Sequence, residues 1–341
     1  MTNIEYADIR CPEAAETLAV NDGIRWLRMP LPFSLDHINL WLLRDSGGWV
    51  VVDTGINSAK TRDVWRSTFE DVMRGEPATH VIATHLHPDH SGCAGWLTAE
   101  FDVDLWMTNL EFTLCRHLIA ESDTPAPESN VAFYRSAGFE EKQLEQYRDN
   151  FGMFGRMVGA LPASYRCMRD GERLEFAGFH WQVVTGGGHS PEHACLFDDE
   201  RNILIAGDML LPSISPNISV WPTNAAGNPL HDWFEGLRRL AARLPTDVLV
   251  LPAHGKPYRG AHARIAQLMR NHETRLDRLL SLCDTPHRVV DVFETLYNVP
   301  INDGNRIMAT GEAIAHLHYL CRDGTMTVEA DEAGVNWYRR A

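Results

Sequence analysis

Three histidines and one aspartate fall within six consecutive residues, as His85, His87, Asp89 and His90. Imidazole nitrogens combined with a carboxylate suit zinc, iron or manganese, whereas calcium and magnesium favour sites built from oxygen alone. The motif directly follows residues 81–83, an apolar run typical of a short buried strand. Because His85 and His87 lie two positions apart in extended chain, their side chains point the same way, toward one ion. The spacing predicts a metal site.

The second half of the motif indicates a second metal ion beside the first. Pro88 ends the extended run, and the small residues Ser91 and Gly92 open a helical stretch. This change of direction turns Asp89 and His90 away from the first pair of ligands. We therefore predict a site for two metal ions.

Three further apolar runs end in a residue that can bind a metal. Such strand ends are where site residues gather in layered α/β folds, and neighbouring glycines allow the backbone to pass close to an ion. The three residues are His189 after residues 183–185, Asp208 after residues 203–206 and His254 after residues 248–251. Each of these three residues alone would be weak evidence for a metal site. Because four strand ends carry the same ligand chemistry, we interpret them as parts of one shared metal centre.

The order His-x-His-x-Asp-His, Gly-His, Gly-Asp and Ala-His-Gly resembles the metallo-β-lactamase-fold hydrolases, over residues 37–255. The resemblance implies two divalent ions, for which zinc is favoured and iron or manganese is compatible. It also implies the ligand sets: His85, His87 and His189 for one ion, Asp89, His90 and His254 for the other, and Asp208 as the bridge. Asp53, in the segment Val-Val-Val-Asp-Thr-Gly, matches an aspartate that supports the metal loop from beneath in that family.

The implied fold is α/β, a four-layer αββα sandwich with a helical insertion and a small C-terminal helical, winged-helix-like region. The pattern of apolar residues agrees with it. Strands are expected at residues 38–43, 49–53 and 80–84, a hairpin at 172–185, and helices at 58–74, 92–100 and 232–243. We predict a catalytic domain over residues 1–260 and a C-terminal region over 261–341.

Two segments lie outside the metal motifs. Residues 108–171 read as helices broken at Pro125, and their many aromatic residues indicate either a lid or pocket wall, or a small core of the insertion itself. The tail reads as helices at 261–283, 288–297 and 311–322 followed by a hairpin that begins near 325–328. Residues 256–341 carry 11 Lys or Arg and 11 Asp or Glu, so packing or a homodimer contact is favoured there over nucleic-acid binding.

Composition narrows the classes of function. The net charge of −15 and the lack of a basic patch argue against a nucleic-acid partner, and no apolar run approaches the roughly 18 residues of a membrane span. The first residues lack a signal-peptide pattern, and seven cysteines without short pairings fit reduced thiols, so a cytoplasmic location is expected.

The expected activity is hydrolysis of an ester, a thioester of the coenzyme A or glutathione type, or a lactone, by a metal-bridging hydroxide. Asp89 and Asp208 are the predicted catalytic residues, with Asp89 moving the proton. Lys256 and Tyr258 follow His254 closely and could meet an anionic small-molecule substrate, and His193 could line the pocket. The alternatives are a sulfur dioxygenase with a single iron and a phosphodiesterase or nuclease, which the charge disfavours. A true β-lactamase is less favoured, because such enzymes are usually secreted.

Overall fold

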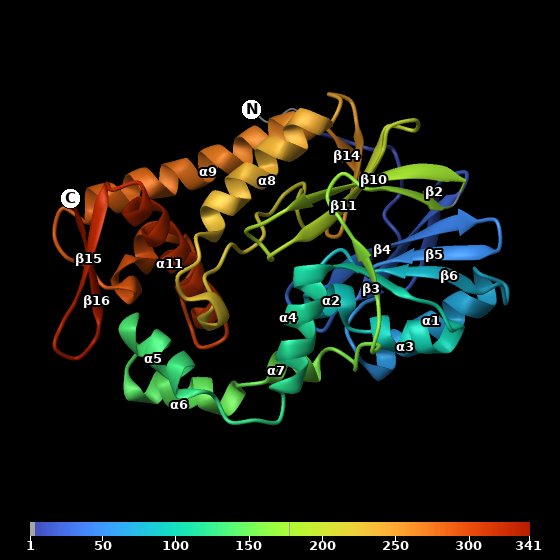
Figure 1. The fold of residues 1–341 in the computed structure, drawn as a ribbon. Coiled ribbons are helices and arrows are strands. Elements are labelled where there is room, and N and C mark those ends of the chain that lie inside the picture. Colours follow the sequence, from blue (N-terminus) through green and yellow to red (C-terminus); the bar gives the residue numbers. More distant parts are fainter. Residues whose placement is uncertain (1–3, 177) are drawn as a thin grey trace.

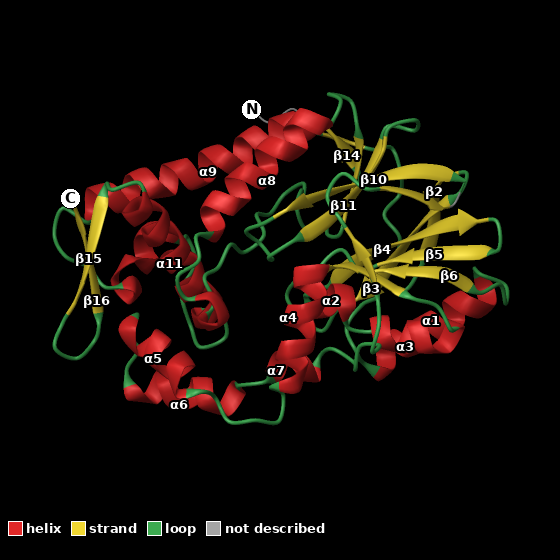
Figure 2. Ribbon diagram, viewed as in Figure 1, coloured by secondary structure: helices red, strands yellow, loops and turns green. Residues whose placement is uncertain are grey.

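Two β-sheets face each other, and helices cover the outer face of each (Figures 1 and 2). A computed structural model describes residues 4–176 and 178–341. Its layers run helix, sheet, sheet, helix, which confirms the expected αββα sandwich. Each sheet contributes strand ends to one shared edge, and this edge holds the predicted site residues.

The first sheet has the strand order β2-β3-β4-β5-β6-β7-β8, and β5 to β8 run parallel. Its strands are β2 (Thr17–Asn21), β3 (Ile24–Pro30), β4 (His37–Asp45), β5 (Gly48–Val52), β6 (Ala78–Ile82), β7 (Leu105–Thr108) and β8 (Arg166–Met168). In β5, Trp49 and Val51 pack toward the helices, whereas Val50 and Val52 pack toward the second sheet. This strand is therefore apolar throughout, as expected for a strand buried on both faces.

The second sheet has the order β1-β14-β13-β12-β11-β10-β9 and is antiparallel except for the β12–β13 pair. Its strands are β1 (Glu5–Tyr6), β9 (Arg173–Phe176), β10 (Phe179–Gly186), β11 (His193–Asp198), β12 (Ile203–Gly207), β13 (Leu249–Pro252) and β14 (Tyr258–Arg259). The expected hairpin of residues 172–185 is confirmed by the β9–β10 pairing. Because β12 and β13 are parallel, Asp208 and His254 emerge at the same edge.

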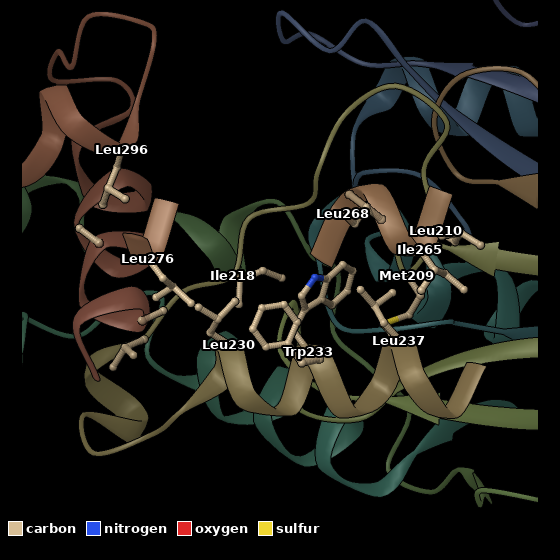
Figure 3. Packing of buried hydrophobic residues seen from close by; sticks show 14 of the residues in the cluster. Met209, Leu210, Ile218, Leu230, Trp233, Leu237, Ile265, Leu268, Leu276 and Leu296 are labelled. Atoms are coloured by element: carbon tan, nitrogen blue, oxygen red, sulfur yellow. The ribbon is translucent and has the colours of Figure 1, made fainter. Parts of the chain in front are cut away.

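Helices α1 (Ala59–Asp71), α2 (Pro88–Ser91) and α3 (Ala94–Phe101) belong to the outer layer of the first sheet, and α8 (Pro229–Arg243) and α9 (Ala261–Leu282) to that of the second. Figure 3 shows Leu230, Trp233 and Leu237 of α8 in the same core as Ile265 and Leu268 of α9. The three α8 residues recur every three or four positions, which places them on one face of the helix.

The insertion between β7 and β8 contains four helices, α4 (Asn109–Ala120), α5 (Glu128–Ser136), α6 (Glu141–Asn150) and α7 (Met153–Arg156). The expected break at Pro125 separates α4 from α5. The expectation of helices up to residue 171 is wrong at its end, because residues 166–168 form edge strand β8 beside β7. Val131, Tyr134, Phe139 and Leu144 form a small core of the insertion itself.

The C-terminal region continues from α9 through the short turns η2 (Val289–Val292) and α10 (Phe293–Leu296) to α11 (Arg306–Arg322) and the hairpin β15 (Met326–Ala330) and β16 (Asn336–Arg340). This order of helices and hairpin agrees with the expected winged-helix-like tail. The insertion lies against this region (Figure 1), since Val290 N–H donates to the carbonyl of Ala137 at 3.2 Å. The division of domains at residue 260 stays a prediction.

Several predicted boundaries differ from the structure by a few residues. The helix expected at 58–74 ends at Asp71, because Arg74 and Gly75 adopt left-handed backbone angles. Helices α8 and α11 begin three and five residues earlier than the predicted 232 and 311, and the helix expected at 288–297 is divided into η2 and α10. The strand expected at 80–84 ends at Ile82, so Thr84 and His85 already belong to the site loop.

All seven cysteines are free thiols. Within residues 4–176 and 178–341, no helix combines the length and apolar character needed to cross a membrane.

Candidate metal centre

The seven predicted ligands lie together at the shared edge of the two sheets. The loop after β6 carries His85 and His87, the short helix α2 carries Asp89 and His90, and the other three follow β10, β12 and β13. They form two groups of donor atoms, each with its atoms within 4.8 Å of one another: His85, His87 and His189, and Asp89, His90 and His254. Asp208 lies between the groups.

The first group consists of three converging imidazole nitrogens. His87 Nδ1 lies 2.8 Å from His85 Nε2 and 3.0 Å from His189 Nε2. His189 Nδ1 lies 2.8 Å from the backbone carbonyl of Asn217, and since only a protonated nitrogen can donate to that carbonyl, the Nε2 of a neutral His189 keeps its lone pair for the site. Burial lowers the pKa of His85 well below its ordinary value and that of His87 to about 3. Both rings are therefore neutral, as a metal ligand requires.

The second group combines a carboxylate with two imidazoles. Asp89 Oδ2 lies 3.4 Å from His254 Nε2 and 3.7 Å from His90 Nε2. His254 Nδ1 donates to the backbone carbonyl of His37 at 2.8 Å, which turns Nε2 toward the site. Burial lowers the pKa of His90, but the carboxylates around it, led by Asp53, hold it well above its ordinary value. This group therefore attracts positive charge.

Asp208 is shared by the two groups. Its Oδ2 lies 3.3 Å from His189 Nε2 of the first group, and its Oδ1 lies 3.5 Å from His254 Nε2 and 3.6 Å from His90 Nε2 of the second. The two oxygens of one carboxylate thus face different groups. This is the place of a bridging ligand between two cations.

Two buried atoms of the centre test whether a cation fits there. His90 Nε2 and Asp208 Oδ1 are fully buried, yet neither has a hydrogen-bond partner among the described residues. Buried polar atoms are normally paired, because an unpaired one loses its hydration without compensation. A divalent cation between these donors would satisfy both atoms, so the residues present fit such an ion.

Asp53 supports the centre from below. It is buried, and its backbone φ of 62° lies in the left-handed region. Its carboxylate accepts hydrogen bonds from Thr84 N–H at 2.8 Å and Thr84 Oγ1 at 3.0 Å, and it holds His90 Nδ1 at 2.8 Å. Asp53 therefore fixes both the loop after β6 and the orientation of the His90 ring, and it does not face the donor groups directly.

His193, at the start of β11, lies beside the centre. Its Nε2 accepts a hydrogen bond from the backbone N–H of Asp208 at 3.0 Å, and its ring centroid is 4.6 Å from that of His85. Gly207 makes this contact possible, because a Cβ there would lie 2.5 Å from His193 Nε2. His193 thus positions Asp208 through the backbone.

Lys256 and Tyr258 lie outside the centre. Lys256 is exposed, and Tyr258 is fully buried in the core under α8 and α9, where its hydroxyl donates to the carbonyl of Leu210 at 3.2 Å. Neither belongs to the described residues that line the cavity next to the centre.

Sequence reasoning missed three residues that hold the site loops. Glu111 of α4 is fully buried and accepts from Leu86 N–H at 2.9 Å and Glu192 N–H at 2.7 Å, so it joins the loops after β6 and β10. Asn39 donates to the carbonyls of Pro252 and Gly255, on either side of His254. Asn217 is the third. A glutamate in a helix, an asparagine in a strand and an asparagine in a loop carry no local signal, so only their positions in the fold reveal these three residues.

A further cluster, His272, Glu312 and His316, lies between α9 and α11. His316 Nδ1 is 2.8 Å from the Glu312 carbonyl, and His272 Nδ1 is 3.1 Å from His316 Nε2. The guanidinium of Arg275 already pairs with the Glu312 carboxylate at 2.8 Å. Its charge would repel a cation, so we interpret this cluster as a hydrogen-bonded network.

A cavity of about 520 Å³ opens beside His87 and His189. Its walls come from the insertion, from residues 219–229 and from the start of α11. The predicted role of the insertion as a pocket wall agrees with this arrangement, and its own small core shows that the second interpretation holds as well.

Comparison with known proteins gives matches over nearly the whole chain. The sequence model of the metallo-beta-lactamase superfamily matches residues 34–254, and that of the metallo-beta-lactamase-like C-terminal domain matches residues 276–341. The crystal structure of a beta-lactamase domain protein from Burkholderia ambifaria is 39% identical, with a TM-score of 0.90 over 99% of this chain and 98% of that one.

Two curated relatives are more distant. The probable metallo-hydrolase YqjP of Bacillus subtilis is 24% identical over 326 residues, which cover 92% of this chain and 94% of that protein. The human acyl-coenzyme A thioesterase MBLAC2 is 28% identical over 199 residues, which cover 56% of this chain and 65% of that protein.

Proposed function

This chain belongs to the metallo-beta-lactamase superfamily, and on that premise we propose that it is a hydrolase that uses two divalent metal ions to cleave an ester or thioester bond. The observation that carries the proposal is the position of Asp208, whose two oxygens face two separate groups of three donors. One ion would be held by His85, His87 and His189, the other by Asp89, His90 and His254, and both by Asp208.

The protein supplies orientation and proton handling. When bound, the two ions would ionise a water near neutral pH and polarise the acyl oxygen of the substrate. The Asp89 side chain is 20% exposed, against 11% for Asp208, so Asp89 is the carboxylate with better access to a substrate. It would take up the proton of that water and pass it to the leaving atom. The carbonyls of His37 and Asn217 hold His254 and His189 in the orientation that ligation needs.

Three observations favour an acyl substrate over a nucleic acid. The human relative is named as an acyl-coenzyme A thioesterase, and the cavity beside His87 and His189 has mainly apolar walls. The net charge of −15 opposes the approach of a phosphate backbone. A thioester or ester with a small-molecule leaving group fits these properties.

Elemental analysis of protein purified without chelator, combined with turnover of chromogenic ester, thioester, lactone and phosphodiester substrates, tests the proposal. We expect about two divalent ions per chain, zinc first among them, and hydrolysis of esters or thioesters that a chelator abolishes. One iron per chain with no hydrolysis of any acyl substrate would contradict the proposal.

A ligand variant tests the assignment of residues. His87→Ala should lower kcat/KM by at least about a hundredfold together with loss of metal, because even residues that only orient a ligand affect affinity by about 10–100-fold. His180→Ala, at an exposed position on β10, is the matched control and should keep metal and activity. Full activity of a His87→Ala protein that has lost metal would overturn the assignment.

A further inference from the structure

The cavity beside the candidate metal centre has a composition that restricts the substrate. At one end it is lined by His87 and His189, which belong to the first donor group. Its other walls carry large apolar and aromatic side chains from three separate parts of the chain. These include Leu118 of α4, Tyr134 of α5, Tyr147 of α6, Phe154 of α7, Met308 of α11 and Trp221 from the segment before α8.

The described lining of the cavity carries acidic side chains and, its histidines apart, no basic ones. Among the described residues that line it, Glu121 and Asp232 are the acidic ones, and no lysine or arginine is present. An anionic group that enters the cavity beyond the metal-binding end would lose its hydration and meet no lysine or arginine in return. The phosphates of a coenzyme or a free carboxylate therefore do not belong in this space.

Two flexible, exposed side chains belong to the lining of the cavity. Met153 and Met308 both line it while 47% and 49% exposed, and they come from the insertion and from α11. Unbranched methionine side chains adapt to partners of different length. A cavity of about 520 Å³ that reaches from His87 and His189 to exposed methionine side chains suits an elongated ligand.

We propose that this cavity binds the acyl part of the substrate, and that this part is an uncharged aliphatic chain longer than an acetyl group. The proposal rests on the proposed function. The carbonyl carbon would lie at the end formed by His87 and His189, and the chain would extend between α4, α7 and Trp221 toward α11. The leaving group, with any charge that it carries, would stay outside these walls.

A series of thioesters with one leaving group and acyl chains from two to sixteen carbons tests the proposal on the metal-loaded enzyme. Each methylene that enters the cavity should raise kcat/KM by about fourfold until the cavity is full. Equal turnover across the series, or a fall with length, would overturn this inference and leave the hydrolase assignment intact. Loss of turnover for every acyl substrate would overturn both.

Charge and shape can be tested separately. A substrate whose acyl chain ends in a carboxylate should react at least about tenfold more slowly than its methyl-ended counterpart, because the carboxylate loses hydration. Equal rates would contradict an uncharged ligand.

Leu118→Trp should lower the ratio of long-chain to acetyl kcat/KM by at least about tenfold, since the added volume overfills the cavity. Leu110→Trp, on the same helix but 52% exposed and outside the cavity, is the control and should keep the wild-type ratio. An unchanged ratio in a folded Leu118→Trp protein would place the chain elsewhere.

Discussion

His189 Nδ1 lies 2.8 Å from the backbone carbonyl of Asn217, and this contact connects the candidate metal centre with the C-terminal region. The side chain of Asn217 donates to Glu312 of α11 at 3.2 Å, and Glu312 in turn pairs with Arg275 of α9 at 2.8 Å. The orientation of a predicted ligand therefore depends on side chains of α9 and α11. The C-terminal region thus helps to hold a predicted metal ligand in place.

Removing the Glu312 carboxylate should weaken metal binding. In Glu312→Ala the Asn217 amide loses an acceptor and Arg275 loses its partner, so the carbonyl that orients His189 is less well fixed. We expect the metal dissociation constant to rise by up to about tenfold, at the lower end of the effect of outer residues. Competition with a chromogenic chelator measures it. Glu312→Gln should recover part of the affinity, and Glu329→Ala, exposed on β15, should have no effect. A lower Tm with unchanged metal affinity would show that Glu312 only stabilises the fold.

Loss of the Asp53 charge should affect the group that contains His90. Asparagine tolerates the left-handed backbone of this position, so Asp53→Asn should fold, but a neutral amide holds His90 Nδ1–H and Thr84 less strongly. We expect about a 10–100-fold loss of affinity for one of the two ions. Metal titration measures the change. Asp102→Asn is the matched control, because Asp102 also has a positive φ, of 53°, and is exposed. Two ions bound with wild-type affinity would contradict the role given to Asp53.

Glu111 should matter for both stability and activity. In Glu111→Gln one of the two backbone N–H groups, of Leu86 or Glu192, faces an amide that cannot accept its hydrogen bond, which should cost about 1–3 kcal/mol of unfolding free energy. Because Leu86 lies between His85 and His87, kcat should fall as well. Thermal unfolding and steady-state kinetics test this, with Glu145→Gln on the surface of α6 as control. An unchanged Tm would mean that the two contacts contribute little.

The network of His272 and His316 should make the fold sensitive to acid. Burial lowers the pKa of His316 to about 4 and that of His272 well below its ordinary value of 6.5. Between about pH 6.5 and 4 the unfolded chain therefore binds more protons than the folded chain, so stability is lost as the pH falls through this range. Unfolding of chelator-treated protein should show this slope, and the double variant His272→Leu, His316→Leu should have a shallower one. Equal slopes would exclude this network as their source.

Short motifs carried the family resemblance that implied the fold class, and they also named the seven predicted ligands, which the structure brings together. His85, His87, Asp89 and His90 occupy six positions after an apolar strand, and the remaining three also follow apolar runs, so each signal is contained in a short segment. The arrangement of Glu111, Asn39 and Asn217 depends on contacts between distant segments, which no short pattern encodes. Helix ends were missed for a similar reason, since Arg74 stops α1 by its backbone conformation and not by its residue type. Tyr258 illustrates the opposite case, because its nearness to His254 in sequence does not place its hydroxyl in the centre.

The predicted ligands stand on strand ends of the sandwich, whereas the cavity walls come from α4 to α7, residues 219–229 and α11. Reactivity and selectivity are thereby encoded in different stretches of the gene. Substitutions in the walls can accumulate while the chemistry is preserved, so one ancestral catalyst can diversify toward new substrates by drift in its periphery. For an engineer, exchange of residues 109–156 between relatives is the natural unit of redesign.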